Sequence, residues 1–142
     1  MIYEVYGPPD AGKTTFTIEK IKDDNHLCLY INADFQIMEN MVHSSLYILN
    51  SNNITTIKDA VVRLQGCIDS IIIDSLPMIT NDEENTDKVI TEIQKIISIC
   101  KKNNIDLYII NQYRMNSRNS EDYTYYLNRL RLYYNERIKV GK

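Results

Sequence analysis

The residues best suited to chemistry lie near the start of the chain, in the segment Gly7-Pro8-Pro9-Asp10-Ala11-Gly12-Lys13-Thr14, which fits the pattern G-x-x-x-x-G-K-[ST]. The two glycines permit backbone angles that turn successive amide N–H groups inward, where they surround phosphate oxygens. Lys13 is predicted to reach the β- and γ-phosphates, and the Thr14 hydroxyl is the expected Mg²⁺ ligand. The sequence therefore predicts a nucleoside triphosphate site formed by Gly7, Pro8, Pro9, Asp10, Ala11, Gly12, Lys13, Thr14 and Thr15.

A strand and a helix flank this loop in the order that phosphate binding requires. Residues 2–6 are predicted to form the strand, and residues 15–21 the helix. A helix that starts at the loop points the positive end of its dipole at the bound phosphates. Because strand, loop and helix follow one another, we favour phosphate binding over a glycine turn that carries a surface lysine.

The rest of the chain alternates apolar runs with helical patterns. Further strands are predicted at 27–31, 46–49, 70–74 and 107–110. Helices are predicted at 35–43, from a cap at Thr55 or Thr56 to Gly66, and over 89–102. This alternation predicts an α/β fold in one domain spanning 1–142, with a mostly parallel central sheet and helices on both faces. After it we expect a polar loop at 113–122, a short helix at 123–128 and a strand at 130–134.

Three polar residues end predicted strands, and ligands gather at the carboxyl ends of parallel strands. Asp74 follows three isoleucines and is predicted to hold Mg²⁺ through a water, although an aspartate there also suits a turn through Ser75. Asp34 either activates the water that attacks the γ-phosphate or caps the next helix, and we favour the catalytic role. Gln112 either contacts the γ-phosphate and signals to the following loop or is simply a polar strand end.

Four segments resemble successive motifs of bacterial RecA recombinases, in the same order and with similar spacing. They are residues 2–15, Tyr30-Ile31-Asn32-Ala33-Asp34, Ile71-Ile72-Ile73-Asp74-Ser75 and Ile109-Ile110-Asn111-Gln112-Tyr113-Arg114-Met115. The resemblance implies a three-layer P-loop NTPase fold of the RecA-like type, with ATP and Mg²⁺ as ligands. It assigns phosphate and Mg²⁺ to Lys13 and Thr14, the rest of the metal site to Asp74, and coupling of the γ-phosphate to DNA binding to Gln112.

Departures from the family pattern shape the remaining expectations. Asp34 stands where the family carries its catalytic glutamate and is one methylene shorter, so hydrolysis is a weaker expectation than binding. The chain begins one residue before its first strand, which implies a minimal RecA-like core that lacks the N-terminal polymerisation element and the C-terminal domain. Such a core is not expected to form a RecA-type filament alone.

DNA contacts are expected from the loop at 113–122, because the segment at 76–87 is acidic. The candidate contacts are Arg114, Arg118 and Asn119, in a tyrosine-bearing stretch suited to weak binding of single strands by charge and stacking. The alternative is that the nearby tyrosines pack against the sheet and the arginines are solvated. The charge distribution is uneven, since residues 1–112 hold 9 basic and 16 acidic residues, a net of −7, whereas residues 113–142 hold 7 and 3, a net of +4.

The composition suits a cytoplasmic protein. Cys28, Cys67 and Cys100 are widely separated and were each expected to be buried thiols in a reducing compartment. The leading interpretation is an ATP-binding, Mg²⁺-dependent ATPase acting in DNA recombination, repair or replication beside a larger recombinase or DNA-processing protein. One alternative is a non-catalytic nucleotide-binding module that caps or regulates a recombinase filament. A small-molecule kinase is a further alternative, although its lid would have to be the acidic segment at 76–87.

Overall fold

The computed structural model describes residues 1–37, 39–114 and 123–141 and contains one six-stranded sheet in which every strand is parallel to its neighbours. The strand order is β3-β2-β4-β5-β1-β6. The strands are β1 (Ile2–Gly7), β2 (Cys28–Asn32), β3 (Leu46–Leu49), β4 (Ser70–Asp74), β5 (Asp106–Gln112) and β6 (Glu136–Lys139). In the described part of the chain, no helix is both long enough and apolar enough to cross a membrane.

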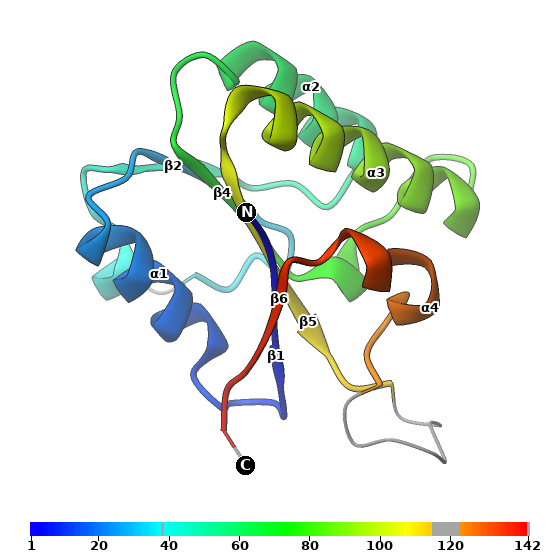
Figure 1. Ribbon diagram of the computed structural model, residues 1–142, viewed down its shortest axis with the longest axis horizontal. Helices are drawn as coiled ribbons and strands as arrows, with labels where there is room; N and C mark the ends of the chain where they lie inside the picture. The colour runs from blue at the N-terminus through cyan, green and yellow to red at the C-terminus, as the bar shows by residue number, and fades with distance from the viewer. Residues whose placement is uncertain (38, 115–122, 142) are drawn as a thin grey trace.

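Helices cover both faces of this sheet, which gives the three layers expected from the sequence (Figure 1). Helix α1 (Lys13–Asp23) lies on one face, and α2 (Ile54–Leu64) and α3 (Thr86–Asn103) pack side by side on the other. The shorter elements are α4 (Leu127–Leu130) and the 3-10 helices η1 (Glu39–Met41), η2 (Leu76–Met78) and η3 (Arg131–Tyr133).

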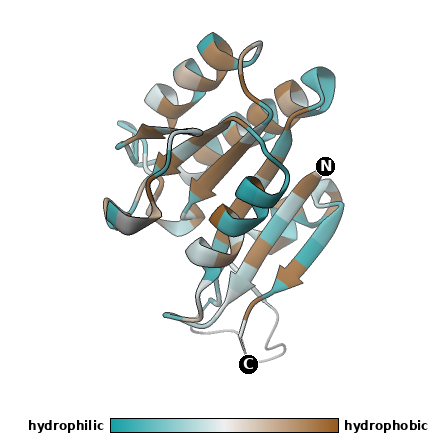
Figure 2. Ribbon diagram, turned by 90° about the vertical axis from the view of Figure 1, so that its left-hand side faces the viewer, coloured by the Kyte–Doolittle hydropathy of each residue, from teal (hydrophilic) through white to brown (hydrophobic). Residues whose placement is uncertain are grey.

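The two faces of the sheet are built by alternate residues of each strand, as the two-residue period of a β-strand dictates. On β4, Ile72 packs toward α1, whereas Ile71 and Ile73 pack toward α2 and α3. Apolar residues therefore dominate the middle strands, while polar residues lie on the outer faces of the helices (Figure 2). Strands buried on both sides read as continuous apolar runs, which is why β2, β4 and β5 could be predicted from the sequence.

The C-terminal strand differs from the prediction. A strand was expected at 130–134, but those residues form the end of α4 and η3, and the strand is β6. Leu130 is fully buried and Leu132 is 97 % exposed, so their alternation does not mark one face of a strand. The Asn135 side-chain oxygen and backbone N–H bond to the backbone of Ile2 at 2.7 Å each, which starts the parallel pairing with β1 one residue before β6 begins.

Four smaller expectations also differ from the structure. The only regular element in the described part of 35–43 is the three-residue η1, and the turn before it is held by Asn32, whose side-chain oxygen accepts from the N–H groups of Gln36 and Ile37. Helix α2 is capped by Asn53, whose side chain accepts from Thr55 and Thr56, rather than by a threonine. The short helix expected at 123–128 is displaced to α4. Cys28 and Cys100 are buried, but Cys67 is exposed in the turn after α2.

Candidate nucleotide-binding site

The loop between β1 and α1 has the geometry of a phosphate-binding loop. Gly12 lies in the left-handed region at φ 87°, directly before the first residue of α1, so the helix opens onto the loop. Gly7 ends β1 where another segment comes very close, since a Cβ on it would lie 2.0 Å from the carbonyl oxygen of Val140. Both glycines of the sequence pattern are therefore required by the backbone.

Lys13 folds back over the loop that precedes it. Its Nζ donates to the carbonyl oxygens of Gly7 at 2.9 Å and Pro8 at 3.1 Å, and the residue is only 8 % exposed. Burial lowers the pKa of Lys13, and the carboxylates of Asp74, Asp10 and Asp34 partly oppose that shift. The positive charge of Lys13 is thus held against two carbonyl oxygens of the loop, where it could neutralise a bound phosphate.

Asp74 and Thr14 form the predicted metal-binding pair. The Thr14 hydroxyl donates to Asp74 Oδ2 at 2.6 Å, and the phenol of Tyr30 donates to the same oxygen. Burial raises the pKa of Asp74, against the lowering effect of these two hydrogen bonds. The carboxylate and the hydroxyl are both hard oxygen donors, so the pair fits Mg²⁺, and the roles of Thr14 as a direct ligand and of Asp74 beside the metal stay predictions.

Asp34 lies two residues after β2 and bonds to Ser75, the residue that follows Asp74. Its Oδ1 accepts from both the N–H and the hydroxyl of Ser75, each at 2.9 Å. Asp34 does not cap a helix, since Asn32 caps the turn that follows β2. Within the described part of the chain Oδ2 makes no hydrogen bond, which leaves one carboxylate oxygen able to accept from a water. The catalytic role of Asp34 stays a prediction.

Gln112 lies beside the loop because β5 is the neighbour of β1 in the sheet, and Gln112 is in register with Gly7. A pocket of about 520 Å³ joins these parts. Its lining includes most of the residues predicted from the sequence: Pro9, Asp10, Ala11, Gly12, Lys13, Thr14, Thr15, Asp34, Asp74 and Gln112. Gly7 and Pro8 do not line the pocket but bind Lys13 through their carbonyl groups.

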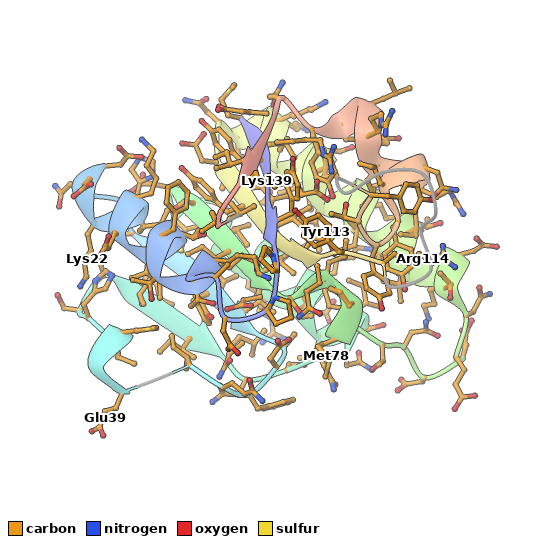
Figure 3. The ribbon with its side chains drawn as sticks, turned by 90° about the horizontal axis from the view of Figure 1, so that it is seen from below. Lys22, Glu39, Met78, Tyr113, Arg114 and Lys139 are labelled. Atoms are coloured by element: carbon orange, nitrogen blue, oxygen red, sulfur yellow. The ribbon has the colours of Figure 1, made fainter. Side chains whose placement is uncertain are left out.

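The candidate DNA contacts are only partly described. Arg114 is exposed and follows Tyr113 at the end of β5, and both are labelled in Figure 3, which looks onto the carboxyl ends of the strands. Arg118 and Asn119 lie outside the described residues. DNA binding by this segment therefore stays a prediction.

Several residues of the pocket were missed by the sequence analysis. Tyr30 and Ser75 matter most, because they hold the carboxylates of Asp74 and Asp34. A signal for Tyr30 was present, since a phenol in a strand buried on both faces needs a hydrogen-bond partner. Ser75 was considered only as part of a turn. The other residues were Asn32, Gln36, Met41 and Ile110.

Comparison with known proteins places this geometry in a known fold. No model of a known protein family matches the sequence. Among solved structures, a KaiC-like protein from the hyperthermophilic archaeon Pyrococcus horikoshii OT3 superposes with a TM-score of 0.60 at 14 % identity, and the RadB recombinase with a TM-score of 0.61 at 19 % identity. Both share the RecA-like arrangement of sheet and helices with this chain. The chain has a RecA-like fold.

The match covers most of this chain but less of its neighbours. It spans 78 % of the chain against 60 % of the KaiC-like protein, and 87 % of the chain against 66 % of RadB. The resemblance to RecA drawn from the sequence motifs is therefore confirmed for the fold.

Proposed function

We propose that this RecA-like chain binds ATP with Mg²⁺ and hydrolyses it, as a minimal module acting in DNA recombination, repair or replication. The observation that carries the proposal is the 2.6 Å contact between the Thr14 hydroxyl and the Asp74 carboxylate, made directly beside a phosphate-binding loop. Asp34 and Gln112 line the same pocket, where Asp34 would face the attacking water and Gln112 the γ-phosphate.

Lys13, the loop N–H groups and Tyr30 would each have a separate role in binding MgATP. Lys13 and the loop N–H groups would hold the phosphates, with Lys13 exchanging its bonds to Gly7 and Pro8 for bonds to phosphate oxygens. Bound Mg²⁺ would neutralise charge on the β- and γ-phosphate oxygens. Tyr30 would keep Asp74 oriented toward Thr14 through its hydrogen bond to the carboxylate.

Asp34 would act as the general base. Ser75 fixes one of its carboxylate oxygens through two hydrogen bonds, which sets the direction of the other oxygen and leaves it to take a proton from the attacking water. This fixed orientation partly offsets the shorter reach of aspartate, since positioning is a large part of catalysis in phosphoryl transfer.

The proposed role in DNA metabolism draws on the fold and on the charge at the end of β5. It is supported by the RecA-like fold and by the likeness to RadB, which is described as a recombinase. The exposed Arg114 at the end of β5 supplies a positive charge suited to a nucleic-acid phosphate. Assembly with a larger recombinase or DNA-processing protein remains part of the proposal.

Phosphate release by the purified protein, measured with MgATP in the presence and absence of single-stranded DNA, tests the proposal. We expect slow release that DNA accelerates and that Asp34→Asn removes. Nucleotide binding without release would favour the non-catalytic module instead. Transfer of phosphate to a small acceptor, with no release to water, would favour a kinase. A protein that binds no MgATP would refute all three functions.

A further inference from the structure

Glu4 is a fully buried carboxylate that the proposed ATPase chemistry does not use. It lies on β1, three residues before Gly7, on the face of the sheet that carries Ile2 in the core beneath α2 and α3. Its relative exposure is 0 %. Glutamate is almost never fully buried unless its charge is paired and its oxygens are hydrogen-bonded, so this position requires specific partners.

Three donors from different parts of the chain converge on Glu4. Oε1 accepts from Arg137 Nε of β6 at 2.7 Å, and Oε2 accepts from Asn111 Nδ2 of β5 at 2.9 Å and from Thr124 Oγ1 at 2.6 Å. Only a carboxylate offers acceptors alone on both oxygens. A glutamine at position 4 would turn an NH₂ group toward one of these donors.

The bond to Asn111 leads directly to Gln112. Asn111 donates through Nδ2 to Glu4, and its Oδ1 accepts from the backbone N–H of Gln112 at 2.9 Å. The same Nδ2 also donates to the carbonyl oxygen of Tyr125 at 2.8 Å, and the Tyr125 N–H donates to the carbonyl oxygen of Gln112 at 3.3 Å. The backbone N–H of Gln112 is therefore held by Asn111, a direct partner of Glu4, and its C=O by Tyr125, the residue after Thr124, which also bonds to Glu4.

Thr124 carries the same arrangement to the residues after Gln112. Tyr113 and Thr124 form an antiparallel bridge, and the Arg114 N–H donates to the carbonyl oxygen of Tyr123 at 3.1 Å. The segment 112–114 is thus paired with the segment 123–125. Both contact β1, the strand that leads into the phosphate-binding loop: Gln112 is in register with Gly7, and Thr124 bonds to Glu4. Glu4 fixes both segments at once.

We propose that Glu4 is a positioning residue that sets Gln112 against the phosphate-binding loop, and so determines how well the site distinguishes ATP from ADP. The inference rests on the proposed function, in which Gln112 contacts the γ-phosphate. Glu4 does not touch the nucleotide. It acts through Asn111, whose side chain bonds both to Glu4 and to the backbone N–H of Gln112, so the loss of its acceptor geometry would loosen the orientation of Gln112.

The test is the ratio of affinities for MgATP and MgADP, measured by titration calorimetry on the full chain and on Glu4→Gln. We expect MgADP affinity to stay within about twofold, because the loop itself is intact, and the preference for MgATP to fall by at least about fivefold, the lower end of usual coupling between sites. In a Gln112→Ala background, Glu4→Gln should change the ratio no further, because the residue through which it acts is already gone.

A second pair of variants keeps the test decisive should Glu4→Gln fail to fold. Thr124→Val removes one donor to Glu4 while keeping the side-chain shape, and Thr124→Ser keeps the hydroxyl. We expect the valine variant to lower the preference for MgATP and the serine variant to retain it.

The outcomes separate this inference from the proposed function. A parent protein that binds neither nucleotide refutes the function and the inference together. A parent that prefers MgATP, with the same preference in Glu4→Gln or in Thr124→Val, overturns the inference alone. If Glu4→Gln lowers the preference for MgATP equally in the Gln112→Ala background, the inference is also overturned. Glu4 would then affect the site without acting through the Gln112 side chain. A parent that binds both nucleotides equally shows that Gln112 senses no γ-phosphate and overturns it as well.

Discussion

Replacement of Lys13 by methionine should remove ATP binding without unfolding the chain, although Lys13 is buried. Methionine keeps most of the length of the side chain but none of its charge. The ammonium group donates to two carbonyl oxygens, and the loss of two hydrogen bonds from a charged group costs about 1.5–3 kcal/mol each. Water in the adjoining pocket can replace part of this loss, because Lys13 lines that pocket.

The pKa shift of Lys13 works in the opposite direction. A base whose pKa is lower in the folded than in the unfolded state reduces stability as the pH falls through the folded pKa, and at neutral pH the charged form already carries that cost. Methionine removes it. Because the two effects oppose each other, we expect the nucleotide-free variant to remain folded and to unfold in one cooperative thermal transition.

The effect on nucleotide affinity should be much larger. A hydrogen bond to a charged group is worth about 1.5–3 kcal/mol, and Lys13 is expected to contact two phosphates, so at least about 3 kcal/mol is lost. Each 1.4 kcal/mol changes an affinity about tenfold, so the Kd for MgATP should rise at least about 100-fold.

Thermal unfolding with and without MgATP measures both effects in one experiment. At about 100 times the parent's Kd, bound nucleotide stabilises the parent by about 2.7 kcal/mol, or about 8 °C. The variant would gain only about 0.4 kcal/mol, or about 1 °C, at the same concentration. Lys20→Met is the matched control, because Lys20 lies on the same helix and pairs with Asp24 at the surface, away from the pocket lining. A full ligand-induced shift in Lys13→Met would refute the site assignment, and an unfolded variant would refute the stability argument.

Three further predictions follow from the same geometry. Asp34→Asn should keep the MgATP affinity and lose phosphate release, while Asp34→Glu should hydrolyse at least as fast as the parent; hydrolysis by Asp34→Asn at the parent rate would remove Asp34 as the base. Because burial raises the pKa of Asp74, its charge costs stability as the pH rises through that pKa. Asp74→Asn should therefore raise the nucleotide-free melting temperature at pH 7 and abolish the Mg²⁺ dependence of ATP affinity. A lower melting temperature would contradict this. Arg137→Met leaves the buried carboxylate of Glu4 without its cation and should destabilise the chain by about 3–5 kcal/mol in urea unfolding. Arg129→Met, which removes an exposed pair, should cost at most about 1 kcal/mol, and equal losses would show that burial of the pair does not matter.

The parts of the site that could be predicted from the sequence are those encoded by neighbouring residues. The phosphate-binding loop is a contiguous pattern whose backbone conformation follows from its glycines, and the buried strands are continuous apolar runs. The position of Asp74 and Asp34 at one edge followed from the rule for parallel sheets. The resemblance to RecA added the order of the motifs, and the solved structures agree with it on the fold.

What the sequence left open depends on contacts between distant strands. Tyr30 meets Asp74 only because β2 and β4 are neighbours in register, with Asn32 opposite Asp74. The C-terminal strand was misplaced because its partner is β1, more than 130 residues earlier, and the alternation of Leu130 and Leu132 was the stronger local signal. Long-range pairing of this kind leaves no periodic pattern in a short segment.

The position of β1 between two neighbouring strands fixes the backbone that leads into the phosphate-binding loop. It pairs with β5 on one side and β6 on the other, so its backbone is fixed up to the glycine that opens the loop. The end of the chain adds to this constraint, because the Val140 N–H donates to the Tyr6 carbonyl at 2.8 Å and the Val140 carbonyl fills the space that a side chain on Gly7 would need. Glu4 ties the same three strands together from within. A phosphate-binding loop held in this way has little freedom to adapt to its ligand, and the nucleotide must instead act on the side chains that face it. Among these, the backbone of Gln112 is hydrogen-bonded to Asn111, a partner of Glu4, so under the proposed function a change at the γ-phosphate would have a short and rigid path from the pocket to the segment that carries Arg114.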